Sequence, residues 1–368
     1  MKIETKTEHF SNPLYLESGR ILEPYDLVYE TYGELDEERS NAILVTHALS
    51  GSHHAAGRYE GDRKPGWWDG LIGDGKAIDT RRFFVICINV IGSCYGSTGP
   101  MSQMYPSEER YRLRFPVVTV KDMVKAQRIL LDRLGIDRLH AIVGGSMGGM
   151  QALRFAVEYP GLAKHTIAMA ATHATRPWAI AFNKVVQEAI VKDPRFKNGN
   201  YDPEDFREEG FTGLAVGRMA GHISYLSPES MDRKFGRAYV ETDGLFELFG
   251  KFQVERYLEY NGYGFSKWFD PLSYLYITKA INIFDISRGY DTLADALKRV
   301  RTDLHLIAFK RDLLFMPHEM KEIETVMCAQ GQEGLVSYYE VDSDYGHDAF
   351  LVELEKFSDY VADVIGKR

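Results

Sequence analysis

The chain has 368 residues, 45% hydrophobic and 26% charged, which is enough for a large core in one enlarged domain or two. A formal net charge of −9 argues against nucleic acid as the main partner, and no apolar run is long enough to cross a membrane. Three scattered cysteines cannot form a disulfide framework, and the charged N-terminal stretch lacks the apolar core of a signal peptide, so we expect a cytoplasmic protein.

The first half of the chain alternates between strand and helix patterns, which is typical of a mostly parallel sheet. A helix is predicted over 120–134 because apolar residues recur there with helical spacing. The predicted strands are 42–46, 83–90, 139–143 and 166–171.

The pattern then changes, because the next hundred or so residues are rich in Tyr, Phe, Met and charge and have helical spacing. The predicted elements from there onward are helices over 240–249 and 254–258, strands over 304–309 and 335–341, and a closing helix over 348–365. We therefore expect an α/β core over 1–174 and 302–368, interrupted by a helical lid insertion over 175–301 that roofs the active site.

Gly144-Gly145-Ser146-Met147-Gly148 follows a predicted strand and leads into helix-like sequence. Gly-x-Ser-x-Gly in this context is the nucleophile elbow of α/β-hydrolase folds. The turn is tight and its serine backbone is strained, so neighbouring positions favour glycine. The sequence predicts Ser146 as a nucleophile at the N-terminus of a helix.

A serine nucleophile needs a histidine base and an acid that orients it, and this fold places them in the chain order Ser, Asp or Glu, His. Asp312 follows the predicted strand 304–309, and His347 follows the next strand. Both are expected at the same sheet edge as Ser146. Asp303 and Asp342 are weaker candidates for the acid, and His305 falls inside a predicted strand, where a structural role fits better.

Two backbone N–H groups must stabilise the oxyanion that forms during acyl transfer. One is expected from Met147, directly after the nucleophile. The other is expected from Leu49, in the loop that follows the strand 42–46.

Three other patterns resemble sites without meeting their requirements. The run 70–77 fits a phosphate-binding loop but ends in Ala77 where Ser or Thr is needed. His53 and His54 are adjacent, so their side chains diverge, and we expect no metal site. Cys94 lies in a glycine-rich loop without a helix-opening elbow, so we expect a packed residue rather than a nucleophile.

Several stretches together resemble the homoserine O-acetyltransferase family along nearly the whole chain. The matching stretches are 46–51, 66–73, 94–100, 144–152, 217–227 and 345–351. In that family the elbow serine, a late aspartate and a late histidine form the triad, which agrees with Ser146, Asp312 and His347. One departure is that Arg311 precedes the acid where the family usually has serine.

The resemblance implies acetyl transfer from acetyl-CoA to the hydroxyl of L-homoserine, by a ping-pong mechanism through an acyl-serine, in methionine biosynthesis. Acetyl-CoA would be a co-substrate, with no permanently bound cofactor and no metal. Arg218 and Asp348 match the family's substrate-binding arginine and aspartate. These two charges suit the carboxylate and ammonium groups of an amino acid. The family also implies a homodimer formed through the lid.

Some alternatives stay open at this point. The donor can be succinyl-CoA, since acetyl and succinyl groups differ by a carboxylate that a single pocket residue could distinguish. The acceptor can be serine, which differs from homoserine by one methylene, worth only roughly 1–3 kcal/mol in a pocket. The same triad also serves esterases and other hydrolases. Arg218 can instead form a salt bridge within the insertion, and Asp348 can cap the final helix.

Overall fold

The computed structural model describes residues 1–62, 64–241 and 245–366. Its main sheet has eight strands in the order β1-β4-β8-β5-β9-β10-β11-β12. The strands are β1 (Ile3–Phe10), β4 (Tyr25–Tyr32), β8 (Phe84–Ile88), β5 (Ala42–Thr46), β9 (Leu139–Gly145), β10 (Ala163–Met169), β11 (Asp303–Phe309) and β12 (Val336–Val341). The six strands from β8 to β12 in this order pair in parallel, whereas β1 and β4 pair antiparallel, so the predicted mostly parallel sheet is confirmed.

Successive residues of a strand point to opposite faces of the sheet. Both faces of this sheet are apolar, and helices cover both. In β5, Leu44 packs into the core beneath the helices on one face, and Ile43 and Val45 pack into the core on the other. The helices of the first face are α1 (Val120–Arg133), α2 (Met147–Glu158) and α9 (Pro317–Ala329), and α11 (Ser358–Gly366) covers the second.

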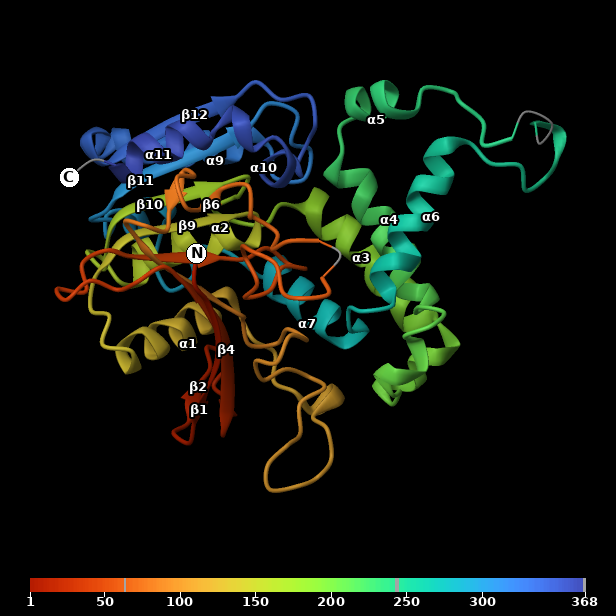
Figure 1. Ribbon diagram of the computed structural model, residues 1–368, viewed down its shortest axis with the longest axis horizontal. Coiled ribbons are helices and arrows are strands. Elements are labelled where there is room, and N and C mark those ends of the chain that lie inside the picture. The colour runs from red at the N-terminus through yellow and green to blue at the C-terminus, as the bar shows by residue number, and fades with distance from the viewer. Residues whose placement is uncertain (63, 242–244, 367–368) are drawn as a thin grey trace.

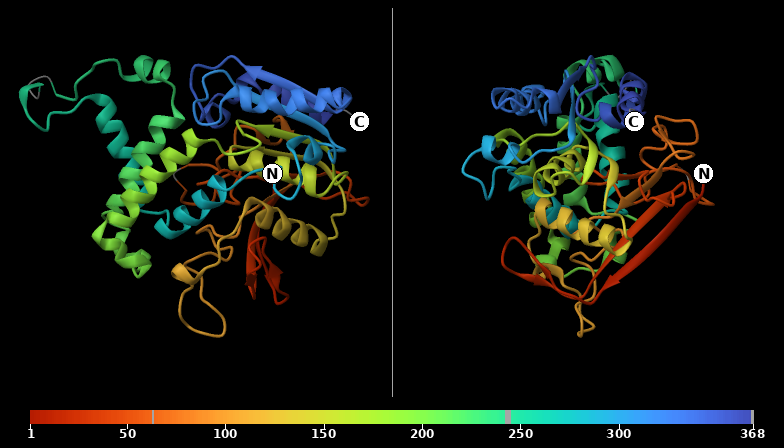
Figure 2. Two further views of the ribbon diagram at one scale, coloured as in Figure 1. Left: turned by 180° about the vertical axis from the view of Figure 1, so that it is seen from behind. Right: turned by 90° about the vertical axis from the view of Figure 1, so that its left-hand side faces the viewer.

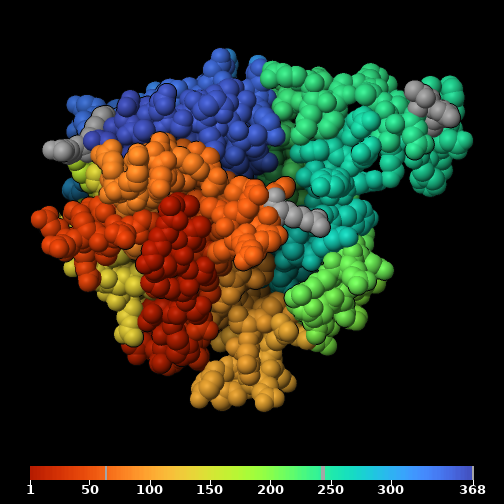
Figure 3. Space-filling view, in the orientation of Figure 1, coloured from red at the N-terminus to blue at the C-terminus, as the bar shows by residue number. Residues whose placement is uncertain are grey.

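Between β10 and β11 the described residues form six α-helices, all inside the predicted insertion. They are α3 (Pro177–Lys192), α4 (Thr212–Tyr225), α5 (Pro228–Phe235), α6 (Gln253–Ser266), α7 (Pro271–Asn282) and α8 (Leu293–Leu297). Helices α3, α4 and α6 stand beside the end of the sheet toward which the β12 arrow points (Figure 1, Figure 2). The space-filling view shows this green and teal part against the blue C-terminal region (Figure 3). The boundaries at 175 and 301 remain a prediction.

The other described strands and the α-helix α10 (Ala349–Val352) are short. The strands form two pairs, β2 (Leu14–Tyr15) with β3 (Ile21–Leu22) and β6 (Ile72–Gly73) with β7 (Ile78–Asp79). Short 3-10 helices lie at Arg112–Arg114, Pro194–Gly199, Pro203–Phe206, Glu333–Leu335 and Leu354–Lys356. No helix in the described ranges is long and apolar enough to span a bilayer.

Two helix predictions are wrong in detail. The closing helix is divided into α10, a 3-10 turn over Leu354–Lys356, and α11. The run 240–249 forms no α-helix in its described part, with 242–244 outside it. Phe246, Leu248 and Phe249 are 84–95% exposed, so these three side chains bury little apolar surface that could stabilise a helix.

Candidate functional site

Ser146 lies at the turn between β9 and α2, with φ 58° and ψ −125°. This left-handed conformation is uncommon for a residue with a side chain and holds the serine in a strained turn. The turn requires glycine at positions 144 and 148, because the backbone there lies too close to neighbouring atoms for any side chain. An added Cβ would lie 2.1 Å from Thr46 Oγ1 at Gly144 and 2.1 Å from the Thr46 carbonyl oxygen at Gly148.

The structure brings Ser146, His347 and Asp312 together as a hydrogen-bonded series. His347 Nε2 lies 2.9 Å from Ser146 Oγ, and His347 Nδ1 lies 2.7 Å from Asp312 Oδ2. A carboxylate only accepts hydrogen bonds, so Nδ1 carries the proton and Nε2 is free to accept one from the serine hydroxyl. All three residues are buried at the carboxyl ends of parallel strands.

The charge of Asp312 sets the behaviour of His347. Burial by itself would lower the pKa of His347, but the Asp312 charge and hydrogen bond, helped by Asp348, outweigh burial and raise that pKa above its usual value. The second Asp312 oxygen accepts the backbone N–H groups of Leu314 at 2.8 Å and Phe315 at 3.0 Å. The acid is therefore held in place by the main chain.

The weaker candidates for the acid have other partners. Asp303 lies 3.3 Å from His165, and Asp342 pairs with Lys310 at 3.0 Å. His305 is buried within β11 and contacts the Tyr360 hydroxyl at 3.0 Å, as expected of a structural histidine.

The loop after β5, which carries Leu49, is fixed by His47. Burial lowers the pKa of His47 to about 4, so the ring is neutral. Its Nδ1–H donates to the Ala48 carbonyl at 2.8 Å, and its Nε2 accepts the Val90 N–H at 3.1 Å. Within the described ranges, the N–H groups of Leu49 and Met147 donate no hydrogen bond, which leaves them open to an oxyanion. Their role stays a prediction.

Arg218 and Asp348 line the same cavity as Ser146, a small space of about 80 Å³. The Arg218 guanidinium lies 4.5 Å from the Phe265 ring centre and 5.2 Å from that of Tyr225. Its Nε is buried without a hydrogen bond, and no salt bridge joins Arg218 to any described residue. The alternative of an internal salt bridge is therefore wrong for the described part of the chain.

Asp348 stands at the start of α10, yet its side chain makes no capping hydrogen bond. Burial raises the pKa of Asp348, whereas the charges of His347 and Arg218 act in the opposite direction. The aspartate thus lies within the electrostatic reach of both residues, and the simple capping role is not what the structure shows.

The catalytic-histidine loop is docked directly on the insertion. Asp348 N–H donates to the Tyr225 carbonyl at 3.1 Å, and Ser227 N–H donates to the Tyr345 carbonyl at 2.9 Å. Gly346 has φ 105°, and a Cβ there would lie 2.6 Å from Ser227 N. The sequence prediction missed Tyr225, although it falls in the stretch 217–227, and also missed Tyr274 and Asn183 in the cavity wall.

The residues of the three patterns that fall short of a site have structural roles. In the run 70–77, Lys76 Nζ binds the carbonyl and carboxylate of Asp69. His54 Nδ1 lies 3.0 Å from a carboxylate oxygen of the buried Glu30. Burial raises the pKa of Cys94 to about 12, which disfavours a thiolate nucleophile. No group of three or more His, Cys, Asp or Glu in the described ranges is placed to hold a metal ion.

Comparisons with known proteins agree with this geometry. The family model for the α/β-hydrolase fold matches residues 41–354. The homoserine O-acetyltransferases of Sulfurimonas autotrophica and Nautilia profundicola are 68% and 64% identical to the chain, each match covering 99% of both sequences.

Two solved structures are similar over nearly the full length. Homoserine O-acetyltransferase from Bacillus anthracis has a TM-score of 0.91 at 30% identity, covering 100% of this chain and 99% of its own. Esterase E22 has a TM-score of 0.88 at 28% identity, covering 99% and 100%. The sheet, the elbow and the full-length similarity together show that the chain is an α/β-hydrolase-fold enzyme that belongs to the homoserine O-acetyltransferase family.

Proposed function

We propose that the protein transfers an acetyl group from acetyl-CoA to the hydroxyl of L-homoserine. The observation that carries this proposal is the pair of opposite charges, Arg218 and Asp348, in the same cavity as the Ser146 hydroxyl. The names of the full-length relatives support the same acceptor and acyl group. The product would serve methionine biosynthesis.

The first half-reaction would load the enzyme. Ser146 Oγ attacks the thioester carbon while His347 Nε2 takes the hydroxyl proton, a transfer supported by their 2.9 Å separation. The N–H groups of Leu49 and Met147 would stabilise the oxyanion. The C–S bond then breaks, the His347 proton passes to the leaving sulfur, and free coenzyme A departs from an acetyl-serine.

The second half-reaction would unload it. The homoserine hydroxyl gives its proton to His347 and attacks the acetyl carbon, and the proton returns to Ser146 Oγ as the ester bond breaks. Arg218 offers a forked set of donors to the homoserine carboxylate, and Asp348 offers an acceptor to its ammonium group. Holding the amino acid at both ends would direct its hydroxyl, rather than water, to the acyl-serine.

Assembly and location are part of the same proposal. A homodimer through the insertion is supported by apolar side chains exposed on its helices, among them Trp178, Val185, Val216 and Ile223. A cytoplasmic location is supported by the unpaired Cys87, Cys94 and Cys328, which suit a reducing compartment.

The test is thiol release from acetyl-CoA and succinyl-CoA, each with L-homoserine, with L-serine and with neither. We expect sustained release only with acetyl-CoA and homoserine. Sustained release without an amino acid would identify a hydrolase, and a preference for succinyl-CoA or serine would identify a different transferase. Ser146→Ala gives the uncatalysed baseline.

A further inference from the structure

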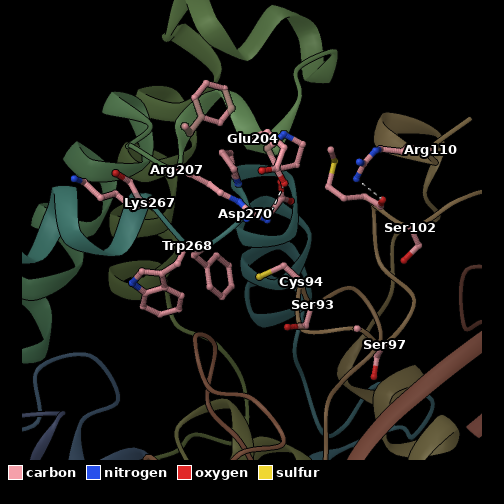
Figure 4. A pocket seen from close by; sticks show the side chains of 17 residues that line it. Ser93, Cys94, Ser97, Ser102, Arg110, Glu204, Arg207, Lys267, Trp268 and Asp270 are labelled. Atoms are coloured by element: carbon pink, nitrogen blue, oxygen red, sulfur yellow. Dashed lines mark hydrogen bonds and ion pairs between the residues drawn. The ribbon is translucent and has the colours of Figure 1, made fainter. Parts of the chain in front are cut away.

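A second and larger cavity lies between the loop after β8 and the insertion (Figure 4). Its volume is about 720 Å³, within the size range of ligand sites, whereas the cavity at Ser146 measures about 80 Å³. Ser93, Cys94 and Ser97 form one wall, and the last two belong to the stretch 94–100, which resembles the family but takes no part in the triad. Trp268, Arg207 and Asp270 face them from the insertion.

A series of contacting aromatic side chains, here called the aromatic wall, links the residues that line the two cavities. Phe265 lies under the Arg218 guanidinium on the catalytic side and stacks on Phe269 at 4.9 Å, and Phe269 lines the larger cavity. Tyr95 completes this wall, because its hydroxyl contacts the carbonyl of Ser50 at 3.5 Å while its ring lies 6.0 Å from that of Phe269. These contacts run from Phe269, in the lining of the larger cavity, to Arg218 and Ser50, in the lining of the cavity at Ser146.

The charged residues of the larger cavity leave cationic donors available. Arg207 pairs with Glu204 at 2.7 Å, and Arg110 donates one Nη1 bond to the Met101 carbonyl at 3.1 Å. Both arginines are exposed, and each guanidinium has five donors, so most remain open to a ligand. Asp270 has other partners, because its oxygens accept the Tyr201 hydroxyl and the Ser273 N–H at 2.6 Å each.

Trp268 gives this cavity an aromatic platform. Its ring packs against Phe265 at 4.8 Å and Phe269 at 5.9 Å, with interplanar angles of 76° and 75°. The side chain is nevertheless 55% exposed, which is unusual for so large an apolar group. An exposed indole and guanidinium groups with open donors, lining one cavity, are a combination that suits a nucleotide, with stacking for the base and charge for the phosphates.

We propose that this cavity binds the phosphorylated adenosine end of the acyl-CoA donor, with Trp268 against the base and Arg110 and Arg207 on the phosphates. This inference rests on the proposed function. The cavity at Ser146 is too small for the whole donor, so only the acyl group and the end of the pantetheine arm enter it. The arm passes the aromatic wall of Tyr95 and Phe269, and no covalent step occurs in the larger cavity.

The experiment compares two donors with homoserine as acceptor. Acetyl-CoA carries the nucleotide, and S-acetylpantetheine carries the same thioester without it. We expect Trp268→Ala to raise KM for acetyl-CoA roughly five- to a hundredfold, the effect of one lost base stack, and Arg110→Ala or Arg207→Ala to raise it roughly two- to tenfold. KM for S-acetylpantetheine and kcat with either donor should change less than about twofold. Arg256→Ala, an equal charge change at an exposed arginine of α6 outside this cavity, is the matched control.

A binding measurement separates this proposal from the proposed function. Adenosine 3′,5′-bisphosphate should bind the wild-type protein in calorimetry, compete with acetyl-CoA, and bind Trp268→Ala more weakly by the same factor as the KM change. Equal effects of the variants on both donors, or equal binding of the nucleotide to wild type and variants, would overturn the nucleotide site. Failure of the wild type to transfer acetyl from acetyl-CoA to homoserine would instead overturn the proposed function.

Discussion

The α/β core and the helical insertion differ in how their polar groups are satisfied. In the core, Ser146, His347 and Asp312 bond to one another, and the main chain supplies the remaining hydrogen bonds of the acid. In the insertion, Arg218 faces the same cavity between aromatic rings with no carboxylate paired to it in the described ranges. Arg218 is half-buried, and its buried Nε has no hydrogen-bond acceptor, which is costly unless a ligand supplies one. We infer that the core performs the chemistry and that the insertion supplies Arg218, one of the two charges that hold the acceptor.

Removal of the nucleophile should have the largest effect, and it tests whether the core performs the acyl transfer. Ser146→Ala should reduce turnover roughly 10⁶-fold, by analogy with serine-protease triads. The wild-type protein incubated with acetyl-CoA alone should gain one acetyl group on Ser146, detected by intact mass and peptide mapping. Transfer activity that survives in Ser146→Ala, or an adduct on Cys94, would move the chemistry elsewhere.

The next largest effect should follow from Asp312→Asn. An amide at this position favours the wrong tautomer of His347, and turnover should fall about 10⁴-fold. The substitution also removes the charge that raises the pKa of His347. A general base works when neutral, so the acid limb of the kcat/KM profile should move to lower pH. An unchanged profile would assign the orienting role to another carboxylate, and Asp342→Asn is the control.

The same contrast explains which features the sequence could predict. The predicted strands 42–46 and 304–309 are confirmed. They could be predicted because a strand that is buried on both faces of a parallel sheet is a nearly continuous apolar run. The antiparallel β1 and β4 were not predicted. β1 lies at the sheet edge and carries exposed charged residues, whereas β4 is buried but includes the polar Glu30 and Thr31 and so lacks a continuous apolar run. Chain order was enough to select Asp312 and His347, because parallel strands bring their carboxyl ends to one edge.

The insertion was harder to predict because its contacts cross long distances in sequence. The setting of Arg218 depends on Phe265, on another helix. The run 240–249 has the apolar spacing of a helix, yet Phe246 is almost fully exposed, so periodicity alone misled. The larger cavity is lined by segments near 94, 207 and 268. These segments are far apart in sequence, so no local sequence pattern predicts that they meet.

If Arg218 binds the acceptor, Arg218→Ala should slow only the second half-reaction. Loss of one charge-assisted contact should slow transfer to homoserine roughly ten- to a hundredfold and leave acetylation of Ser146 nearly unchanged. Rapid-quench measurement of each half-reaction separates the two steps. Arg233→Ala, an exposed arginine of α5 paired with Asp344, is the control for lost charge in the insertion. Equal slowing of both steps would mean that Arg218 supports the fold rather than the acceptor.

The smallest effect is expected at Arg311, the residue that precedes the acid. Its guanidinium lies 3.3 Å from Glu229 of α5 and 3.8 Å from Asp344, and all three side chains are partly exposed. Such surface pairs contribute about 0–1 kcal/mol, so Arg311→Ser should lower the free energy of unfolding by no more than about 1 kcal/mol. Because backbone N–H groups of Leu314 and Phe315 hold the acid, kcat and the acid limb of the pH profile should not change. A shift of the acid limb, with the denaturation midpoint unchanged, would contradict this expectation. It would show that the contact at Arg311 between the core and the insertion also changes the pKa of His347. The two regions would then be coupled more closely than their hydrogen bonds indicate.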